Sequence, residues 1–191
     1  DAPTLSATAT NPGFTENNSA ADLFSAVSVS GVEAGDTIDS LSLTVSNLAD
    51  GADEVVNIDG SAVALTNGNS GNTSGSSYFY SVSVAGATAT ISLTTTGMST
   101  AAAATLVDNL SYQNNNDTPT EGSRVVTLTS VQDSGGVANG GVDTTALSIV
   151  STVTVAAGND DPVNTGSLPT DVTGSEDVTS HVDRSAIHIS E

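Results

Sequence analysis

The chain has 191 residues, with 22 Asp and Glu against only two basic residues, Arg124 and Arg184, so its formal net charge is −20 at pH 7. Nucleic acids and anionic membrane surfaces are excluded as partners, because both must be neutralised by Lys and Arg. The absence of Cys rules out disulfides and thiolate metal sites, and no apolar run reaches the roughly 18 residues of a membrane span. A metal cation is the natural counter-charge, although an acidic surface can also serve solubility alone.

Period-two alternation of apolar residues predicts strands along most of the chain. Gly, Asn and Asp separate these runs, and Asp59-Gly60 predicts the turn of a hairpin. Only 101–109 has a helical pattern, with Ser99 and Thr100 as a cap, and the Gly, Asn, Ser and Thr run at 67–77 predicts a mobile surface loop. The predicted strands lie at 4–10, 22–30, 41–45, 55–58, 62–65, 78–84, 88–93, 125–131 and 146–155. This pattern is typical of an all-β fold, an antiparallel β-sandwich with one short helix.

The sequence also contains an internal repeat of about 160 residues. An acidic junction ending in proline opens the chain at Asp1–Pro3 and returns at Gly158–Pro162, and Glu16 and Glu176 follow these junctions at nearly equal distances. Without an initiator Met or a signal sequence, the chain is expected to be an excised piece of an array. The expected parts are a complete domain at 1–158, a calcium-binding linker at 159–162 and the first strands of an incomplete copy at 163–191.

Antiparallel strands bring the turns of a sandwich together at two ends, which we name the upper and lower poles. The upper pole is the end at which the first strand begins, and the lower pole is the end at which the last strand leaves for the linker. The acids and amides expected there are Asp1, Glu33, Asp36 and Asp133 at the upper pole, and Glu16, Asn159, Asp160 and Asp161 at the lower pole.

Carboxylates gathered in this way need a counter-charge. Two of them about 5 Å apart repel by roughly 3 kcal/mol at an effective dielectric constant near 20. Three together cost on the order of 10 kcal/mol, which is comparable to the whole stability of a domain. Such a cluster must be protonated, spread into water or neutralised, and Ca²⁺ prefers the oxygen ligands on offer here. Asp39 and Asp143 could be ligands or solvated acids, whereas Asp50, Asp53, Glu54 and Asp59 are interpreted as turn acids.

Several short segments, taken together and in order, resemble the cadherin-like and Ig-like repeats of very large bacterial surface adhesins, including the extender regions of RTX adhesins. The resemblance covers nearly the whole chain. Its carriers are Asp1–Pro3, Thr15–Asn17, Val32–Thr37, Leu106–Asn114, Pro119–Val126, Asp133–Gly136 and Gly158–Pro162.

The resemblance implies that calcium ions at the domain junctions are bound by an early-strand Glu, by linker Asn and Asp, and by Asp from two loops. It places these roles on Glu16 and on the linker residues Asn159, Asp160 and Asp161, with Glu176 beginning the next copy. For the junction before the domain it implies Asp1, Glu33, Asp36 and Asp133. It also implies an extracellular protein at the bacterial surface, whose partners are neighbouring repeats and, through other domains, host, biofilm or surface ligands.

Catalysis finds little support in this sequence. The complete domain has no Cys and no His, and the chain has no nucleophile elbow or phosphate-binding loop. A carboxylate-only hydrolase would normally also need aromatic platforms, of which the domain has few. His181 and His188 lie only in the incomplete copy, without a metal or catalytic partner in the sequence. The expected protein is therefore not an enzyme.

Two non-enzymatic functions remain. In the first, calcium at both poles stiffens a string of sandwiches, so that the domain is a spacer that holds an adhesive region away from the cell. In the second, the domain itself binds a sugar, peptide or protein, for which the candidates are the aromatic run Tyr78–Tyr80 and the adjacent 67–77 loop. Residues 163–191 are either a simple truncation or part of a domain split by an insertion.

Overall fold

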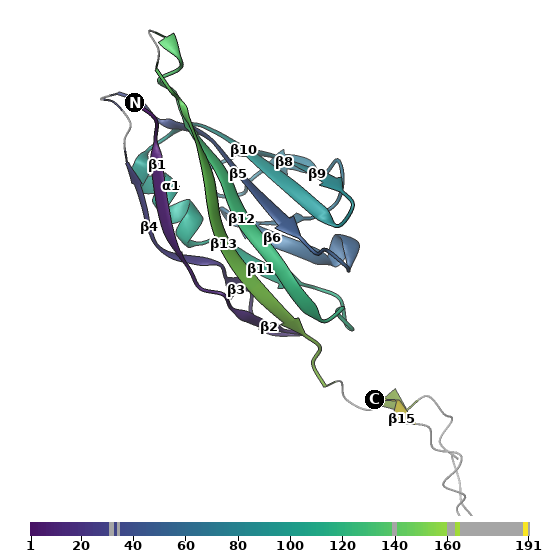
Figure 1. The fold of residues 1–191 in the computed structure, drawn as a ribbon. Coiled ribbons are helices and arrows are strands. Elements are labelled where there is room, and N and C mark those ends of the chain that lie inside the picture. The colour runs from purple at the N-terminus through teal and green to yellow at the C-terminus, as the bar shows by residue number, and fades with distance from the viewer. Residues whose placement is uncertain (31–32, 34, 139–140, 160–162, 165–188, 191) are drawn as a thin grey trace, which may run out of the picture. The chain divides into compact units, whose positions relative to one another are not determined.

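The computed structural model describes residues 1–30, 33, 35–138, 141–159, 163–164 and 189–190 (Figure 1). The chain divides into two compact units, Asp1–Ala157 and Gly158–Glu191. In the second unit, β14 (Val163–Asn164) pairs antiparallel with β15 (Ile189–Ser190). Most of the expected incomplete copy lies outside the described residues, as do Asp160, Asp161 and Glu176, so these parts stay predictions.

The first unit is an all-β sandwich, as predicted. Its larger layer is a seven-stranded sheet in which all neighbours are antiparallel except β13 and β2, which pair in parallel. In spatial order the strands are β2 (Gly13–Thr15), β13 (Thr144–Ala156), β12 (Gly122–Asp133), β5 (Ile38–Ser46), β10 (Thr88–Met98), β9 (Phe79–Ala85) and β8 (Ser70–Asn72).

The second layer combines a four-stranded sheet with a separate strand pair. The sheet has the order β3 (Ala21–Asp22), β11 (Ser111–Asn114), β6 (Glu54–Ile58) and β7 (Ser61–Ala64), and the pair is β1 (Thr4–Ala9) with β4 (Phe24–Ser30). The helix α1 (Thr100–Asp108) lies against β4, and a short 3-10 turn, η1 (Gly51–Asp53), precedes β6. Among the described residues, no helix has both the length and the apolar character needed to cross a bilayer.

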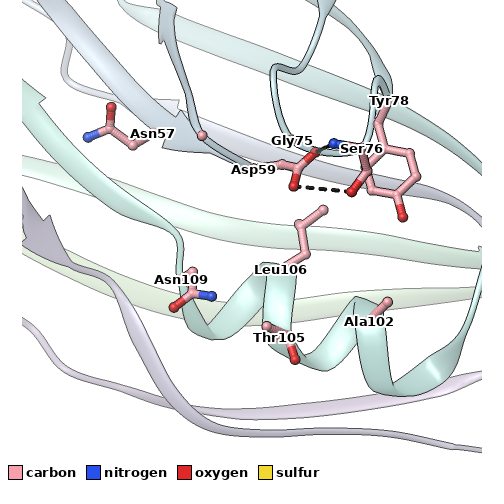
Figure 2. Close-up of a pocket in the computed structure, with 10 residues that line it drawn as sticks. Asn57, Asp59, Gly75, Ser76, Tyr78, Ala102, Thr105, Leu106 and Asn109 are labelled. Atoms are coloured by element: carbon pink, nitrogen blue, oxygen red, sulfur yellow. Dashed lines mark hydrogen bonds between the residues drawn. The ribbon is translucent and has the colours of Figure 1, made fainter.

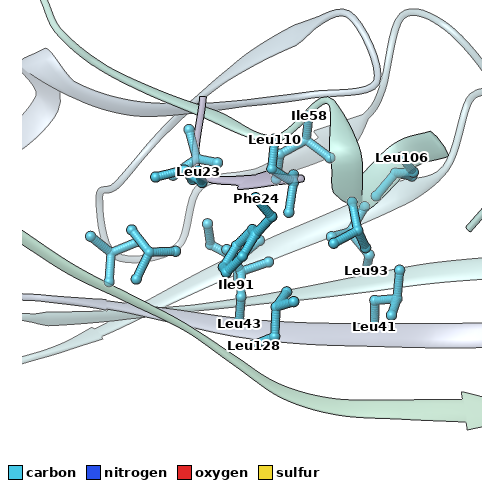
Figure 3. Close-up of a cluster of buried hydrophobic side chains, with 14 of the residues drawn as sticks. Leu23, Phe24, Leu41, Leu43, Ile58, Ile91, Leu93, Leu106, Leu110 and Leu128 are labelled. Carbon is cyan, nitrogen blue, oxygen red and sulfur yellow. The ribbon is translucent and has the colours of Figure 1, made fainter. Parts of the chain in front are cut away.

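The core lies between these layers and follows the predicted alternation. Leu41, Leu43 and Val45 of β5 are buried, while the Ser and Thr residues between them are partly exposed, so one face of the strand meets the core. Figure 3 shows side chains of the larger sheet, such as Leu43 and Leu128, gathered with those of the second layer into one cluster. This apolar burial is the main driving force for folding.

Local signals located the regular elements well. The predicted hairpins appear as β6–β7 and β9–β10. The predicted helix begins one residue early, and the side chain of Ser99 caps it by accepting a hydrogen bond from the Ala102 N–H at 3.2 Å. The prediction of a loop throughout 67–77 was wrong at β8, because these three small polar residues pair with β9 through their backbone. The sequence analysis also missed β2, β3 and β11, because two to four residues are too few to show the alternation of apolar and polar side chains that marks a strand.

A buried ionic network crosses the sandwich near the start of β12. Arg124 is 2% exposed and forms ion pairs with Glu54, through Nε, and with Asp50, at 3.3 Å from Nη2. Tyr112 donates a hydrogen bond to Glu54 at 2.9 Å, and burial followed by this carboxylate raises the pKa of the Tyr112 hydroxyl. Burial alone would raise the pKa of Asp50, but hydrogen bonds from Thr120 and Asn114 outweigh it and lower that pKa.

These contacts correct the interpretation of two acids. Asp50 and Glu54 are interior ion-pair partners and not merely turn acids, and Glu54 is fully buried at 0% exposure. Both Ala49 and Asp50 donate backbone hydrogen bonds to Glu54 Oε2, at 2.9 and 3.2 Å. Such bonds satisfy the oxygens that Arg124 does not reach, which is the condition for a buried charge to be tolerated.

We predict that Arg124→Met lowers the free energy of unfolding by about 3–5 kcal/mol, because it leaves buried carboxylates without a cation. Urea denaturation would measure this loss, and melting should fall by roughly 10 °C. The control is the triple variant Asp50→Asn, Glu54→Gln, Arg124→Met, which removes the charges on both sides and should recover much of the loss. A single variant that loses less than about 1 kcal/mol would contradict the network's importance.

Candidate metal centre

The upper pole of the first unit is formed by the N-terminus, the β4–β5 connection and the β12–β13 turn, which lie at one end of the unit (Figure 1). Two backbone-directed bonds fasten the two loops together. The Ser134 N–H donates to the Thr37 carbonyl at 2.9 Å, and the Thr37 N–H donates to Ser134 Oγ at 3.0 Å. The loops that carry Asp36 and Asp133 are therefore held side by side.

A β-bulge in β12 aims Asp133 into the protein. Up to Leu128 the even-numbered residues of β12 are buried, and after the bulge between Leu128 and Ser130 the odd-numbered ones, Val131 and Asp133, are buried instead. One inserted residue exchanges the faces of a strand, because its side chains alternate. Without the bulge Gln132 would point inward, and Asp133 would be solvated.

Asp133 is 3% exposed, and only part of its carboxylate is satisfied. Its Oδ1 accepts a hydrogen bond from the Gly135 N–H at 3.0 Å, whereas Oδ2 is buried and has no partner among the described residues. Native proteins pair nearly all buried polar atoms, and a carboxylate oxygen is among the most costly to leave unpaired. Asp133 Oδ2 is therefore a buried carboxylate oxygen that the described part of the chain leaves unsatisfied.

Three carboxylates share the space above Gly135. A Cβ added to this glycine would stand 2.8 Å from Asp36 Oδ2, 3.3 Å from Asp133 Oδ1 and 3.4 Å from Glu33 Oε2. Gly135 therefore keeps open a space that any side chain would fill. We name Glu33, Asp36 and Asp133 the acidic triad. The predicted convergence of these acids on one pole is found in the structure, whereas their role as metal ligands stays a prediction.

The charges in the acidic triad perturb one another. Glu33 forms an ion pair with the Asp1 ammonium, and this contact, followed by a hydrogen bond with Asp36, lowers the pKa of the Glu33 carboxyl. Desolvation, followed by the hydrogen bond with Glu33 and the charges of Glu33 and Asp133, raises the pKa of Asp36. The Asp1–Glu33 pair is exposed, so it contributes little stability. The surroundings of Asp36 therefore disfavour its ionised form.

The three acids of the triad lie close together, but they do not form a complete set of metal ligands. Among the described residues, no group of three or more His, Cys, Asp and Glu side chains is arranged so that it could hold a metal ion by itself. Two nearby acids also have other partners. Asp143 accepts hydrogen bonds from Gln132 and Thr144, of which the former mainly lowers its pKa, and Asp39 accepts one from Thr37.

Glu16 occupies the opposite end of the same unit, as predicted. It is 4% exposed, its N–H donates to the Ala156 carbonyl at 3.1 Å at the end of β13, and Asn17 donates a hydrogen bond to its Oε1 at 3.2 Å. Beside it lies a hollow of about 260 Å³ lined by side chains that the sequence analysis did not single out, including Asn17, Asn114 and Asp117. Asn159 belongs to the second unit, so the lower junction stays a prediction.

We predict that Asp36→Asn stabilises the domain in the presence of a chelator. The substitution keeps the shape of the side chain and removes its repulsion by Glu33 and Asp133, so the melting temperature in EDTA should rise by a few degrees. Asp39→Asn is the matched control, because Asp39 lies three residues away and outside the acidic triad, and its substitution should give no such rise. A fall in melting temperature for Asp36→Asn would mean that this carboxylate already has adequate partners.

Comparison of the chain with protein-family models, with curated proteins and with solved structures finds no match. The acidic triad therefore has to be interpreted from its own geometry and charge.

Proposed function

We propose that the chain is a calcium-rigidified spacer domain of a long bacterial cell-surface adhesin, in which it projects a distal binding region for adhesion or biofilm formation. The observation that carries the calcium part is the buried Asp133 Oδ2, which lacks a partner among the described residues. The other oxygen of the same carboxylate, Oδ1, shares the space above Gly135 with Asp36 and Glu33. A cation bound there would supply the missing partner and the counter-charge together. Glu33, Asp36 and Asp133 would hold it, with the Asp1 segment beside them.

The chemistry of the available ligands favours calcium over other common metals. Residues 1–159 contain no Cys and no His, so soft or imidazole-preferring metals such as zinc lack their usual ligands. Carboxylates and loop carbonyls are the oxygen ligands of Ca²⁺ and Mg²⁺, and calcium accepts the more irregular arrangement. Loops joined by a few hydrogen bonds, as at Thr37 and Ser134, suit this tolerance.

The spacer part rests on how the first unit is threaded. Asp1 lies at the upper pole, and β13 ends at the opposite pole, so the chain enters at one end of the sandwich and leaves at the other (Figure 1). A domain threaded in this way extends an array by its full length. Neighbouring repeats of the same chain are the proposed partners, and a cation that ties the entry segment to the pole would limit bending there.

We predict that calcium raises the melting temperature of the chain by roughly 5–10 °C relative to EDTA. This follows from about 2.7 kcal/mol of added stability at a 100-fold excess over the dissociation constant, which for extracellular calcium modules is about 0.1–1 mM. Magnesium at equal concentration is the ionic-strength control and should give a much smaller rise. No calcium-specific shift would mean that the acidic triad does not bind calcium. In that case the spacer proposal loses its stiffening element.

A second prediction separates the triad from other calcium sites. Gly135→Ala keeps every charge but places a methyl group in the shared space, so we expect it to weaken the calcium-induced shift at least as much as Asp133→Asn does. Gly13→Ala is the matched control, because a Cβ there has no neighbour within 4 Å. Isothermal titration of all three variants with calcium would test this. A full calcium response in Gly135→Ala would place the ion elsewhere, at the lower pole for example.

A further inference from the structure

A cavity of about 550 Å³ opens between α1 and the loop 73–78, well apart in sequence from the acidic triad (Figure 2). We name it the α1 groove. Its floor is α1, with the exposed Ala102 and the largely buried Leu106, and its other wall is the turn between β6 and β7 together with the loop. Its volume lies within the range of about 300–1,000 Å³ that is typical of small-molecule sites.

The Asp59 carboxylate joins the two parts of the wall of the α1 groove, the β6–β7 turn and the 73–78 loop. Asp59 Oδ2 accepts hydrogen bonds from Thr73 Oγ1 and from the Ser76 N–H, both at 2.6 Å, and Oδ1 accepts one from Ser76 Oγ at 3.3 Å. The Gly75 N–H donates to the Asp59 carbonyl at 2.9 Å, and a Cβ on Gly75 would stand only 2.4 Å from Asp59 Oδ1. Gly75 is thus needed for the loop to close onto this acid.

Two residues of the same wall have positive φ values, Asp59 at 45° and Ser77 at 59°. Asp59 and Gly60 form the tight turn between β6 and β7, in which both residues adopt the left-handed conformation that Asp and Gly accept readily. The Asp59 hydrogen bonds join this turn to the 73–78 loop, so the two parts of the wall keep a fixed arrangement.

Apart from Asp59, the polar side chains that line the α1 groove are neutral, and several have spare hydrogen-bonding capacity. In the described part of the chain, the Tyr78 hydroxyl and the Asn109 side chain form no hydrogen bond, and Asn57 uses its amide nitrogen on Ser111 at 3.3 Å, which leaves its carbonyl oxygen available. Figure 2 shows the Tyr78 ring on one side of the groove and Leu106 pointing into it from α1. A ligand with several hydroxyl groups and an apolar ring face fits this set.

Charged ligands fit the α1 groove less well. No Lys or Arg lines it, and the net charge of −20 repels anions. A cation would seek the one carboxylate present, but Asp59 already accepts three hydrogen bonds from Thr73 and Ser76. Placing an ammonium there would break the bonds that shape the wall. The chemistry therefore selects a neutral polyhydroxylated molecule.

We propose that the α1 groove binds a neutral sugar ring, with the apolar face of the sugar against Tyr78 and Leu106 and its hydroxyls bonded to Asn57, Asn109 and the Tyr78 hydroxyl. This activity goes beyond the spacer function and does not depend on calcium. With it, the domain itself binds a glycan, at a site on the side of the sandwich.

The test is a titration of the ¹⁵N-labelled chain with methyl glycosides of glucose, galactose, mannose and N-acetylglucosamine, followed by amide chemical shifts. We expect at least one glycoside to shift the amides of α1 and of the 73–78 loop with millimolar affinity. Sodium chloride should leave that affinity unchanged, because no charge pair forms. No shifts with any of the four at high millimolar concentration, or shifts that lie elsewhere on the sandwich, would overturn the proposal.

Two matched pairs of variants locate the binding. Ala102→Phe fills the α1 groove and should weaken binding by at least about tenfold, whereas Ala101→Phe, on an exposed neighbour outside the lining, should leave it unchanged. Tyr78→Phe should weaken it roughly threefold to tenfold through one lost hydrogen bond, with Tyr80→Phe as its control. Binding that survives Ala102→Phe overturns the assignment. Shifts at the groove by methylammonium but not by glycosides would assign it to cations instead.

Discussion

The bulge in β12 between Leu128 and Ser130 is the constraint on which the upper pole depends. It changes which residues of the strand face the core, so that Val131 continues the apolar interior and Asp133 follows it inward. Without it, the same strand would bury Gln132 and leave Asp133 in water. The register shift between Leu128 and Ser130 occurs in the pairing of β12 with both of its neighbours, β5 and β13, so both neighbouring strands fix it. The position of Asp133 at the pole is therefore fixed by strand pairing in the larger sheet, and does not depend on the conformation of the loop that follows β12.

The two poles deal with buried acid in opposite ways. Near the lower pole, Asp50 and Glu54 surround Arg124, the only basic residue in the first 159, and hydrogen bonds satisfy the remaining oxygens. At the upper pole no basic side chain is left for Asp133, Asp36 and Glu33. A buried charge is tolerated when it is paired and hydrogen-bonded. The first network meets this condition within the chain, and the second meets it if a cation is bound, which is the physical basis for the calcium proposal.

The sandwich keeps the two proposed sites, the acidic triad and the α1 groove, apart within one small domain. Its sheets hold the poles apart and leave the face carrying α1 available, where Asp59 shapes the α1 groove through the 73–78 loop. Asp59 is thus a third acid satisfied inside the chain, by hydroxyl and backbone donors in place of a cation. The proposed spacer and sugar-binding roles would use different surfaces and different chemistry, so one could be altered without the other.

The sequence alone was enough to predict the all-β sandwich, most strands, the capped helix and the set of acids at the upper pole, because alternation, turn residues and antiparallel connection are local properties. It could not show that Asp133 is buried, since the bulge arises from how β12 pairs with strands far away in the sequence. Nor could it separate Asp50 and Glu54 from solvated turn acids, because their burial depends on Arg124, 70 or more residues later. The α1 groove likewise exists only in the folded protein, in which Asp59 bonds to the 73–78 loop and both lie opposite α1. Burial and pairing between distant segments were decided by the tertiary structure, since they follow from the packing of the layers and not from local pattern.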